Sequence, residues 1–167
     1  TLTEPSASRI SAQLASAGYS SFCESVTKIE FLSQKVTAPK KAEVPDLCIF
    51  LSQHAARQYL EEVYCEAHKK CKFLAIGPST AEILRFGGLY VVEPEHASSE
   101  GLLACAIVQS IKADDHVSIF CGEDGRDILQ KYLEKRCHLN VVNLYRRIVR
   151  PIKNPDVIDA NIILVGS

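Results

Sequence analysis

The sequence predicts an α/β protein with two doubly wound domains joined by a two-strand hinge, the first domain being incomplete in this chain. Short apolar segments alternate with longer mixed segments between residues 46 and 147. These apolar segments are almost continuously hydrophobic, which is typical of parallel strands buried on both faces. Two proline-containing segments without periodicity, 33–45 and 148–159, separate this region from the two chain ends and are predicted to be linkers.

The chain ends are predicted to form the first, discontinuous domain from residues 1–32 and 160–167. Pro5 favours a helix start, and a helix is expected over residues 6–17, with Gly18 as its stop signal. Residues 22–32 are predicted to be extended, and residues 160–165 form a last apolar strand. These segments are too few for a complete sheet, so the C-terminal part of this domain is expected to be missing.

The second domain is predicted to occupy residues 46–147 and to be complete. Its five strands are expected at 47–51, 72–76, 89–92, 116–120 and 139–144. Its four helices are expected at 53–66, 80–86, 99–111 and 124–136. Five strands alternating with helices indicate a flavodoxin-like domain, and both domains are assigned to this type.

The composition and charge of the chain argue against several classes of protein. Nineteen Lys and Arg against twenty Asp and Glu give a net charge of −1, which argues against a general nucleic-acid coat. No apolar run reaches the ~18–20 residues that a membrane helix needs. The seven cysteines are odd in number and irregularly spaced, and several lie in apolar runs. This favours reduced, mostly buried thiols and a cytoplasmic location.

Four strand-to-helix junctions could carry chemistry. They lie at residues 52–54, 77–80, 98–101 and 121–126. Each offers Ser, Thr or Gly where a helix begins, and in an open α/β sheet most such junctions share the edge at the carboxyl ends of the strands. Free backbone N–H groups there favour an anionic ligand. For any single junction, plain helix capping is the simpler interpretation, and Ser79 with Glu82 fits a capping box. Several junctions at one edge favour a binding cleft.

Three other features each leave a structural alternative open. Arg126 could bind a carboxylate or pair with a neighbouring acid. Cys121 could be an activated thiol near a helix start, although a small buried side chain is the simpler interpretation. The Cys65, His68 and Cys71 spacing offers only three ligands, so no metal site is predicted, and His68 is interpreted as part of a cationic helix end.

A basic cluster follows the fifth strand. Arg146, Arg147, Arg150 and Lys153 lie within a few residues of Tyr145, at the predicted hinge. Such a cluster in a nearly neutral protein can attract a polyanionic small molecule. A solvated linker that is basic by chance is the alternative.

Six segments in order resemble uroporphyrinogen-III synthases. They are the opening TLTEP with AGY, IFLSQHA, AIGPSTA, the stretch from Pro94 to GLL, GEDGRDIL and LYRR. These are similar to the family's TRP…L…G, I-F-T-S-x-x-A-V, A-V-G-x-x-T-A, P-x-x-x-x-S-E-G-L-L, G-x-x-G-R-x-x-L and Y-R-R patterns. In that family, two or three more βα units follow the strand matched by IILVGS and complete the first domain, so the resemblance implies that this domain is incomplete in residues 1–167.

The resemblance implies cyclisation of hydroxymethylbilane, which carries eight carboxylates, with loss of water and inversion of ring D. It implies no metal or organic cofactor, no nucleic-acid or membrane partner, a monomer, and a transient contact with hydroxymethylbilane synthase. Tyr145 matches the position expected to assist the leaving hydroxyl. The residues expected to bind substrate are Thr3, Ser52, Gly77, Ser79, Thr80, Ser99, Gly101, Gly122, Arg126 and Arg146. The competing hypothesis is a non-catalytic module that binds an acidic ligand or a protein partner.

Overall fold

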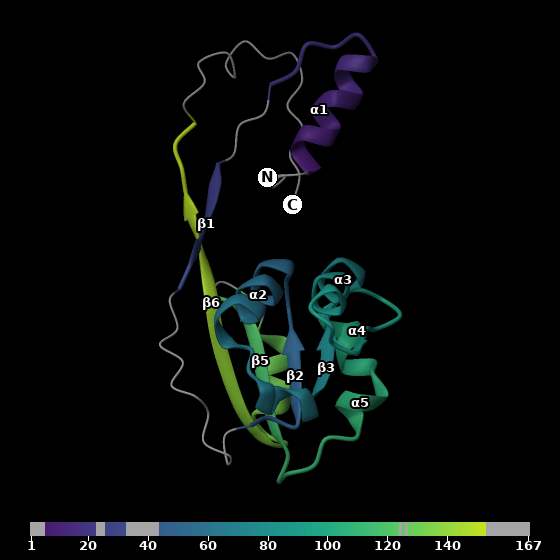
Figure 1. Ribbon diagram of the computed structural model, residues 1–167, viewed down its shortest axis with the longest axis vertical. Helices are drawn as coiled ribbons and strands as arrows, with labels where there is room; N and C mark the ends of the chain where they lie inside the picture. The colour runs from purple at the N-terminus through teal and green to yellow at the C-terminus, as the bar shows by residue number, and fades with distance from the viewer. Residues whose placement is uncertain (1–5, 23–25, 33–43, 124, 126, 153–167) are drawn as a thin grey trace. The chain divides into compact units, whose positions relative to one another are not determined.

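The computed structural model describes residues 6–22, 26–32, 44–123, 125 and 127–152 (Figure 1). The chain divides into two units, residues 1–29 with 147–167 and residues 30–146. The predicted strand at 160–165 and most of the predicted linker at 33–45 lie outside the described residues.

The first unit contains one described helix, α1 (Ser6–Ser16). Its stop at Gly18 is confirmed, because Gly18 has a φ of 84°. Gly18 N–H donates to the Ala15 carbonyl at 3.0 Å and Tyr19 N–H donates to the Leu14 carbonyl at 3.0 Å. This pair of bonds is a Schellman motif, in which glycine adopts the left-handed conformation without a side-chain clash.

Two strands run through both units. They are β1 (Thr27–Phe31) and β6 (His138–Val149). Leu32 N–H donates to the Leu144 carbonyl at 2.9 Å, and Arg150 N–H donates to the Val26 carbonyl at 2.8 Å. Residue numbers therefore rise along one strand as they fall along the other, and the pair is antiparallel. The prediction that the strand ends at 144 is wrong, because pairing with β1 keeps β6 extended to Val149.

The second unit is built on a parallel sheet. Its strands β2 (Leu47–Phe50), β3 (Lys72–Ala75), β4 (Val91–Val92) and β5 (His116–Gly122) join β6 and β1 in the order β1-β6-β5-β2-β3-β4. The five strands from β2 to β6 are parallel to their neighbours. The doubly wound α/β class is thus confirmed. Counted along the chain, their order is 3-2-1-4-5 rather than the flavodoxin-like 2-1-3-4-5, which corrects that detail.

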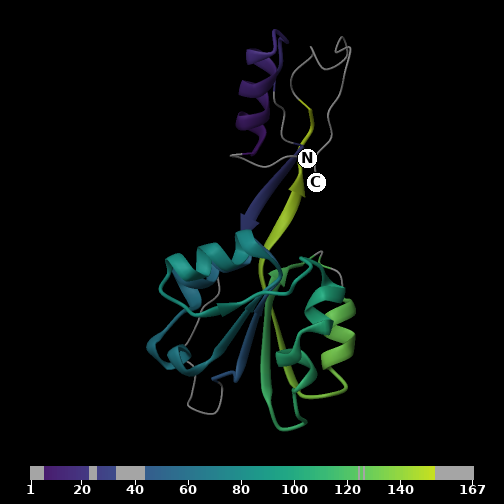
Figure 2. The same ribbon diagram turned by 90° about the vertical axis from the view of Figure 1, so that its right-hand side faces the viewer.

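Helices cover both faces of this sheet (Figure 2). The described helices are α2 (Gln53–Gln58), α3 (Pro78–Phe86), α4 (Ser99–Ala104), α5 (Ala106–Gln109) and α6 (Ile128–Leu133). The helix predicted over 53–66 changes to a π-helical turn at Tyr59–Val63, and a separate 3-10 helix follows at Glu66–Lys70. The helix predicted over 99–111 breaks at Cys105, whose ψ of 132° is extended.

Alternate residues of each central strand enter opposite cores. Leu47 and Ile49 pack with side chains from α4, α5 and α6 such as Leu102. Phe50, on the other face, stacks on Phe120 with ring centroids 5.0 Å apart. Both faces are fully buried, which explains why the strands read as continuous apolar segments.

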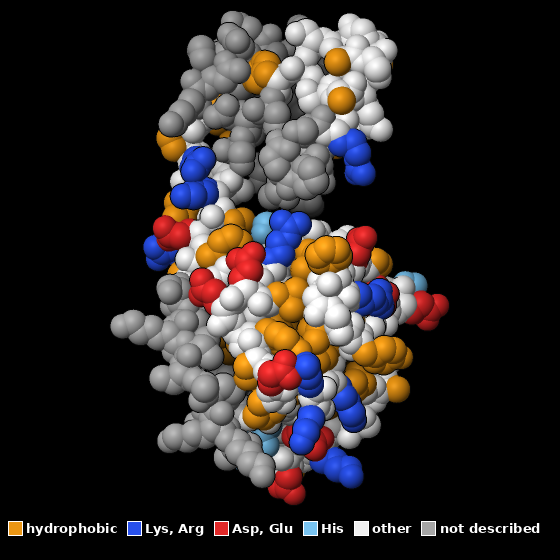
Figure 3. Space-filling model, in the orientation of Figure 1, with side chains coloured by type: hydrophobic (Ala, Val, Ile, Leu, Met, Phe, Trp, Pro, Cys, Tyr) orange, Lys and Arg blue, Asp and Glu red, His pale blue; other side chains and the backbone are white. Residues whose placement is uncertain are grey.

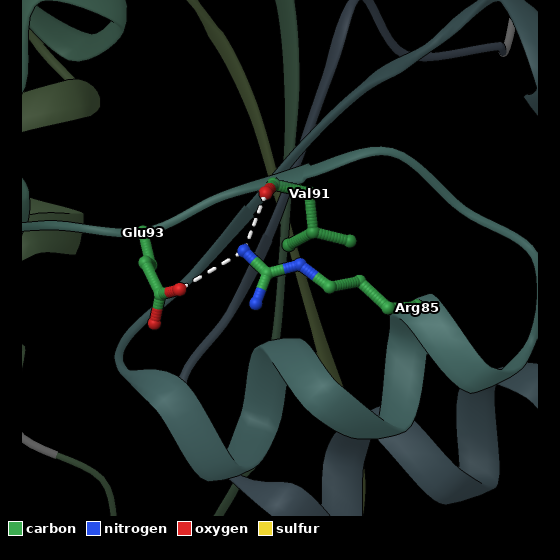
Figure 4. A network of polar contacts seen from close by, with 3 residues as sticks. All are labelled: Arg85, Val91 and Glu93. Atoms are coloured by element: carbon green, nitrogen blue, oxygen red, sulfur yellow. Dashed lines mark hydrogen bonds and ion pairs between the residues drawn. The ribbon is translucent and has the colours of Figure 1, made fainter.

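Arg85 secures the edge strand β4, which ends the sheet beside β3 (Figure 4). Its guanidinium, reaching from α3, donates to the Val91 carbonyl at 3.0 Å and to Glu93 Oε1 at 2.9 Å. A carbonyl engaged by a side chain is less open to pairing with another strand.

The surface of the second unit seen in Figure 3 mixes acidic and basic side chains and lacks one large field of a single sign. This distribution fits the net charge of −1. Within the described part of the chain, every helix is too short or too polar to cross a bilayer.

Candidate active site

The predicted junctions of the second unit lie at the carboxyl ends of the parallel strands, which form one edge of the sheet. Phe50, Ala75 and Phe120, near the ends of β2, β3 and β5, lie side by side in register. Strands β3 and β4 lie on one side of β2, whereas β5, which comes next along the chain, lies on the other side of β2. The topological switch point of the sheet is therefore between β2 and β5. Ligands of open α/β sheets bind outside the carboxyl ends of the strands at such a point.

Tyr145 lies at this edge because β6 contains an irregularity. Cys121 pairs with Asn143, whereas Gly122 pairs with Tyr145, so β6 holds one extra residue between the two pairs. Such a bulge re-aims the side chain that follows it. Glu123 N–H then donates to the Tyr145 carbonyl at 3.0 Å, which fixes the new register. Tyr145 is 4% exposed.

Gly122 makes room for the Tyr145 ring. A Cβ at position 122 would lie 2.6 Å from Tyr145 Cε2 and Cζ and 3.0 Å from its hydroxyl oxygen. Real Cβ atoms do not approach so closely, so the ring can occupy this place only above a glycine. The predicted catalytic residue and one predicted binding residue are therefore in contact.

His54 is a residue of this site that the sequence prediction did not single out. It lies in the first turn of α2, and its ring meets the Tyr145 ring edge to face, with centroids 5.4 Å apart. Its ring also meets that of Phe31 of β1, with centroids 6.4 Å apart. His54 stands in the junction at 52–54, but no local pattern could show that residue 145 would reach it.

Two serines at the edge cap helices. Ser52 Oγ accepts from Ala55 N–H at 3.1 Å, and Ser98 Oγ accepts from Gly101 N–H at 3.0 Å. Ser99 begins α4 and is 7% exposed. Gly101 allows the preceding loop to pass close by, because a Cβ there would clash with the His96 carbonyl oxygen. Capping and close packing thus account for much of this junction.

The junction after β3 differs from its prediction. Gly77 is the N-cap of α3 and Pro78 its first residue, so the capping box of Ser79 with Glu82 is wrong. Proline is favoured at this first position because its missing N–H has no helical acceptor there. Ser79 is exposed, and Thr80 is 4% exposed. A Cβ on Gly77 would lie 2.7 Å from Ala97 Cβ, so the loop before α4 packs on this junction.

Arg146 points to a partner within the second unit. Its Nε and Nη2 both lie 2.5 Å from Glu30 Oε2. Both side chains are well exposed, at 50% for Arg146 and 38% for Glu30. Thr3 and Arg126 lie outside the described residues.

The remaining candidates are structural. Cys121 is 1% exposed, and burial raises the pKa of its thiol, so an activated nucleophile is disfavoured. His68 is 4% exposed and its Nδ1 lies 2.9 Å from the Tyr59 hydroxyl. The interpretation of His68 as a cationic helix end is wrong, because burial lowers its pKa. Among the described residues, His, Cys, Asp and Glu form no group of three suited to a metal ion.

Burial of His68 predicts a pH dependence of stability. Its folded pKa is lowered, so the unfolded chain takes up a proton first as the pH falls below about 6.5. The free energy of unfolding should therefore fall with pH from there until the folded pKa is reached, and then stop responding to this group. Urea midpoints measured from pH 7.5 to 5 should show this slope. His68→Gln should flatten it, and parallel curves for the two proteins would contradict the assignment.

Comparison with known proteins identifies the family. Residues 8–162 match the family described as uroporphyrinogen-III synthase HemD. The chain belongs to the uroporphyrinogen-III synthase family. The match spans both units and every described strand, so the resemblance found in the six sequence segments is confirmed.

Solved uroporphyrinogen III synthases from Thermus thermophilus have the same fold. A mutant aligns with a TM-score of 0.64 over 85% of this chain and 59% of its own. The wild-type protein in another crystal form aligns with a TM-score of 0.55 over 89% of this chain and 61% of its own. Sequence identity is 18% in both cases. The chain thus spans about three fifths of these synthases. No curated protein sequence matches it.

Proposed function

We propose that this protein is a uroporphyrinogen-III synthase that cyclises hydroxymethylbilane with inversion of ring D. The observation that carries the proposal is the place of Tyr145. In a chain of this family, its ring lies over Gly122, against His54 and beside the switch point of the sheet. The predicted polar junctions end at the same edge. This is where an α/β sheet binds its ligands.

The proposed reaction places little demand on acid–base groups. The substrate hydroxyl takes up a proton and leaves as water, which makes the methylene carbon on ring A electron-poor. Ring D attacks this carbon, its old bond to ring C is remade at its other side so that the ring is inverted, and a proton is released as the neutral macrocycle forms. Because the substrate can also cyclise without ring inversion, the protein must mainly hold one folded conformation of it. Tyr145 is proposed to donate a hydrogen bond to the departing hydroxyl, in an auxiliary role. No cofactor is included in the proposal.

The edge residues are proposed to bind the carboxylates and pyrroles of the substrate. Ser79 is exposed, and Ser52 and Gly101 are partly exposed. Thr80 and Ser99 are buried, so we assign them to shaping the loops that approach the substrate. Thr3 and Arg126 remain proposals from the sequence.

Arg146 is proposed to exchange its internal partner for a substrate carboxylate. An ion pair as exposed as Arg146 with Glu30 stabilises a protein by only about 0–1 kcal/mol. Glu30→Gln should therefore change stability little and should raise the affinity for uroporphyrin III, the stable oxidised form of the proposed product, about two- to threefold. Tyrosine fluorescence quenching would measure this affinity. Glu66→Gln, which breaks the exposed pair with Lys69, is the matched control. Equal affinities for all three proteins would remove Arg146 from the site.

We also propose the division into domains. The first domain comprises residues 1–32 and 160–167, the second comprises residues 46–147, and residues 33–45 and 148–159 connect them. The division of the described chain near residues 29/30 and 146/147 supports it. A cytoplasmic monomer is proposed as well. Its support is that the cysteines in the described part are free and that Arg85 engages the edge strand β4.

The test of the proposed function is the isomer composition of the product. The full-length protein is incubated with freshly prepared hydroxymethylbilane, and the products are oxidised and separated. Isomer III above the protein-free control supports a synthase. Isomer I alone, from folded protein that still binds uroporphyrin III, would indicate the non-catalytic binding module.

A further inference from the structure

His54 is held between two aromatic rings from different strands. The Phe31 and His54 rings meet at 61° with centroids 6.4 Å apart, and the His54 and Tyr145 rings meet at 64° and 5.4 Å. His54 is half-buried, Phe31 is 45% exposed and Tyr145 is 4% exposed. The three rings thus form a row that leads from the surface to the buried tyrosine, with His54 in the middle.

The contacts of Tyr145 indicate how the His54 ring can fix its orientation. Gly122 leaves space at the phenol end of Tyr145, as the distances of 2.6 Å and 3.0 Å from a hypothetical Cβ show. Space alone does not fix a side chain, because a strand residue has more than one favourable χ1 rotamer. The His54 ring supplies a packing partner on an element that is itself fixed, since Ser52 caps the start of α2. Edge-to-face packing of this kind favours one ring orientation.

We propose that His54 is a positioning residue whose ring packs against Tyr145 and holds it over Gly122. Phe31 and Tyr145 both meet the His54 ring edge to face, and a flat side chain suits these two contacts. The effect of His54 on turnover rests on the proposed function. The packing itself can be measured without any activity.

The first test is the order of the Tyr145 ring in the full-length protein. When tyrosine is labelled with ¹³C at Cε, each tyrosine ring of the protein gives its own NMR signal. The signal that is lost in Tyr145→Phe belongs to Tyr145. In His54→Phe this signal should stay dispersed. In His54→Ala it should move toward the random-coil value or broaden, with His54→Leu as a second variant that keeps the volume. His116→Ala, at the opposite edge of the sheet, should leave it unchanged. A wild-type signal in His54→Ala would overturn the proposal.

The second test separates the ring from the proton. For His54→Ala, kcat should fall about three- to tenfold while KM stays within about twofold of wild type. His54→Phe should retain both constants within about twofold and keep the shape of the pH–rate profile. If His54→Phe is as slow as His54→Ala and loses a limb of that profile, the proton acts and the proposal is wrong. If the wild-type protein forms no isomer III, the proposed function fails, and the NMR experiment still decides the packing.

Discussion

Gly122→Ala should displace Tyr145 and lower both stability and turnover. The new methyl group would lie 2.6 Å from two carbons of a ring that is 4% exposed, so the ring or the strand must shift. Overpacking of this kind costs about 1–3 kcal/mol. Because misplacing a reacting group by about 1 Å can cost on the order of 100-fold in rate, we expect turnover to fall about 10- to 100-fold. Urea unfolding and the rate of isomer III formation measure the two effects.

A glycine in the same loop supplies the control. Among the described residues, a Cβ on Gly125 would meet only the Gly122 carbonyl oxygen, at 3.4 Å, which is an ordinary contact. Gly125→Ala should therefore change both quantities much less. In a Tyr145→Ala background the clash partner is gone, and Gly122→Ala should cost little further stability. A full, additive cost in that background would show that the glycine serves another purpose.

Tyr145→Phe should lower kcat about tenfold and leave the fold intact. The substitution removes the hydroxyl and keeps the ring, which supplies the contacts with Gly122 and His54. An essential general acid would contribute about 10²–10⁴-fold, and the proposed auxiliary role places Tyr145 below that range. Because the hydrogen bond is proposed to form as the hydroxyl leaves, KM should change by less than about twofold.

The outcome for Tyr145→Phe discriminates between two roles. Unchanged kcat would remove the hydroxyl from the reaction and leave Tyr145 as a packing residue. A loss of affinity for uroporphyrin III at constant kcat would assign it to binding. Far-UV circular dichroism and the urea midpoint show whether the variant is folded.

The sequence was sufficient for the class of fold. The buried strands, such as Leu47–Phe50, carry an unbroken apolar pattern, and the alternation with helices predicts a parallel sheet. Strand order was not predictable in the same way, because it depends on which helical connections cross β2. The length of β6 was also missed. The part beyond Leu144 carries Arg146 and Arg147 and so breaks the apolar pattern of a buried strand, and its extended form depends on pairing with β1.

The candidate site was predicted in part. The junction residues and Tyr145 share an edge as expected, because parallel strands place their carboxyl ends together. The extra residue in β6 opposite Cys121 and Gly122 leaves no local signature, yet it decides where Tyr145 lies. His54 and Glu30 were missed because their partners, Tyr145 and Arg146, are distant in sequence and are brought near only by the sheet.

The initial rate of isomer III formation tests the account most directly. Wild-type, Tyr145→Phe and Gly122→Ala full-length proteins should be compared with the protein-free reaction on the same preparation of hydroxymethylbilane. The account predicts isomer III as the main product of the wild-type protein and lower rates for both variants. Isomer I at the protein-free rate for a folded wild-type protein would contradict it.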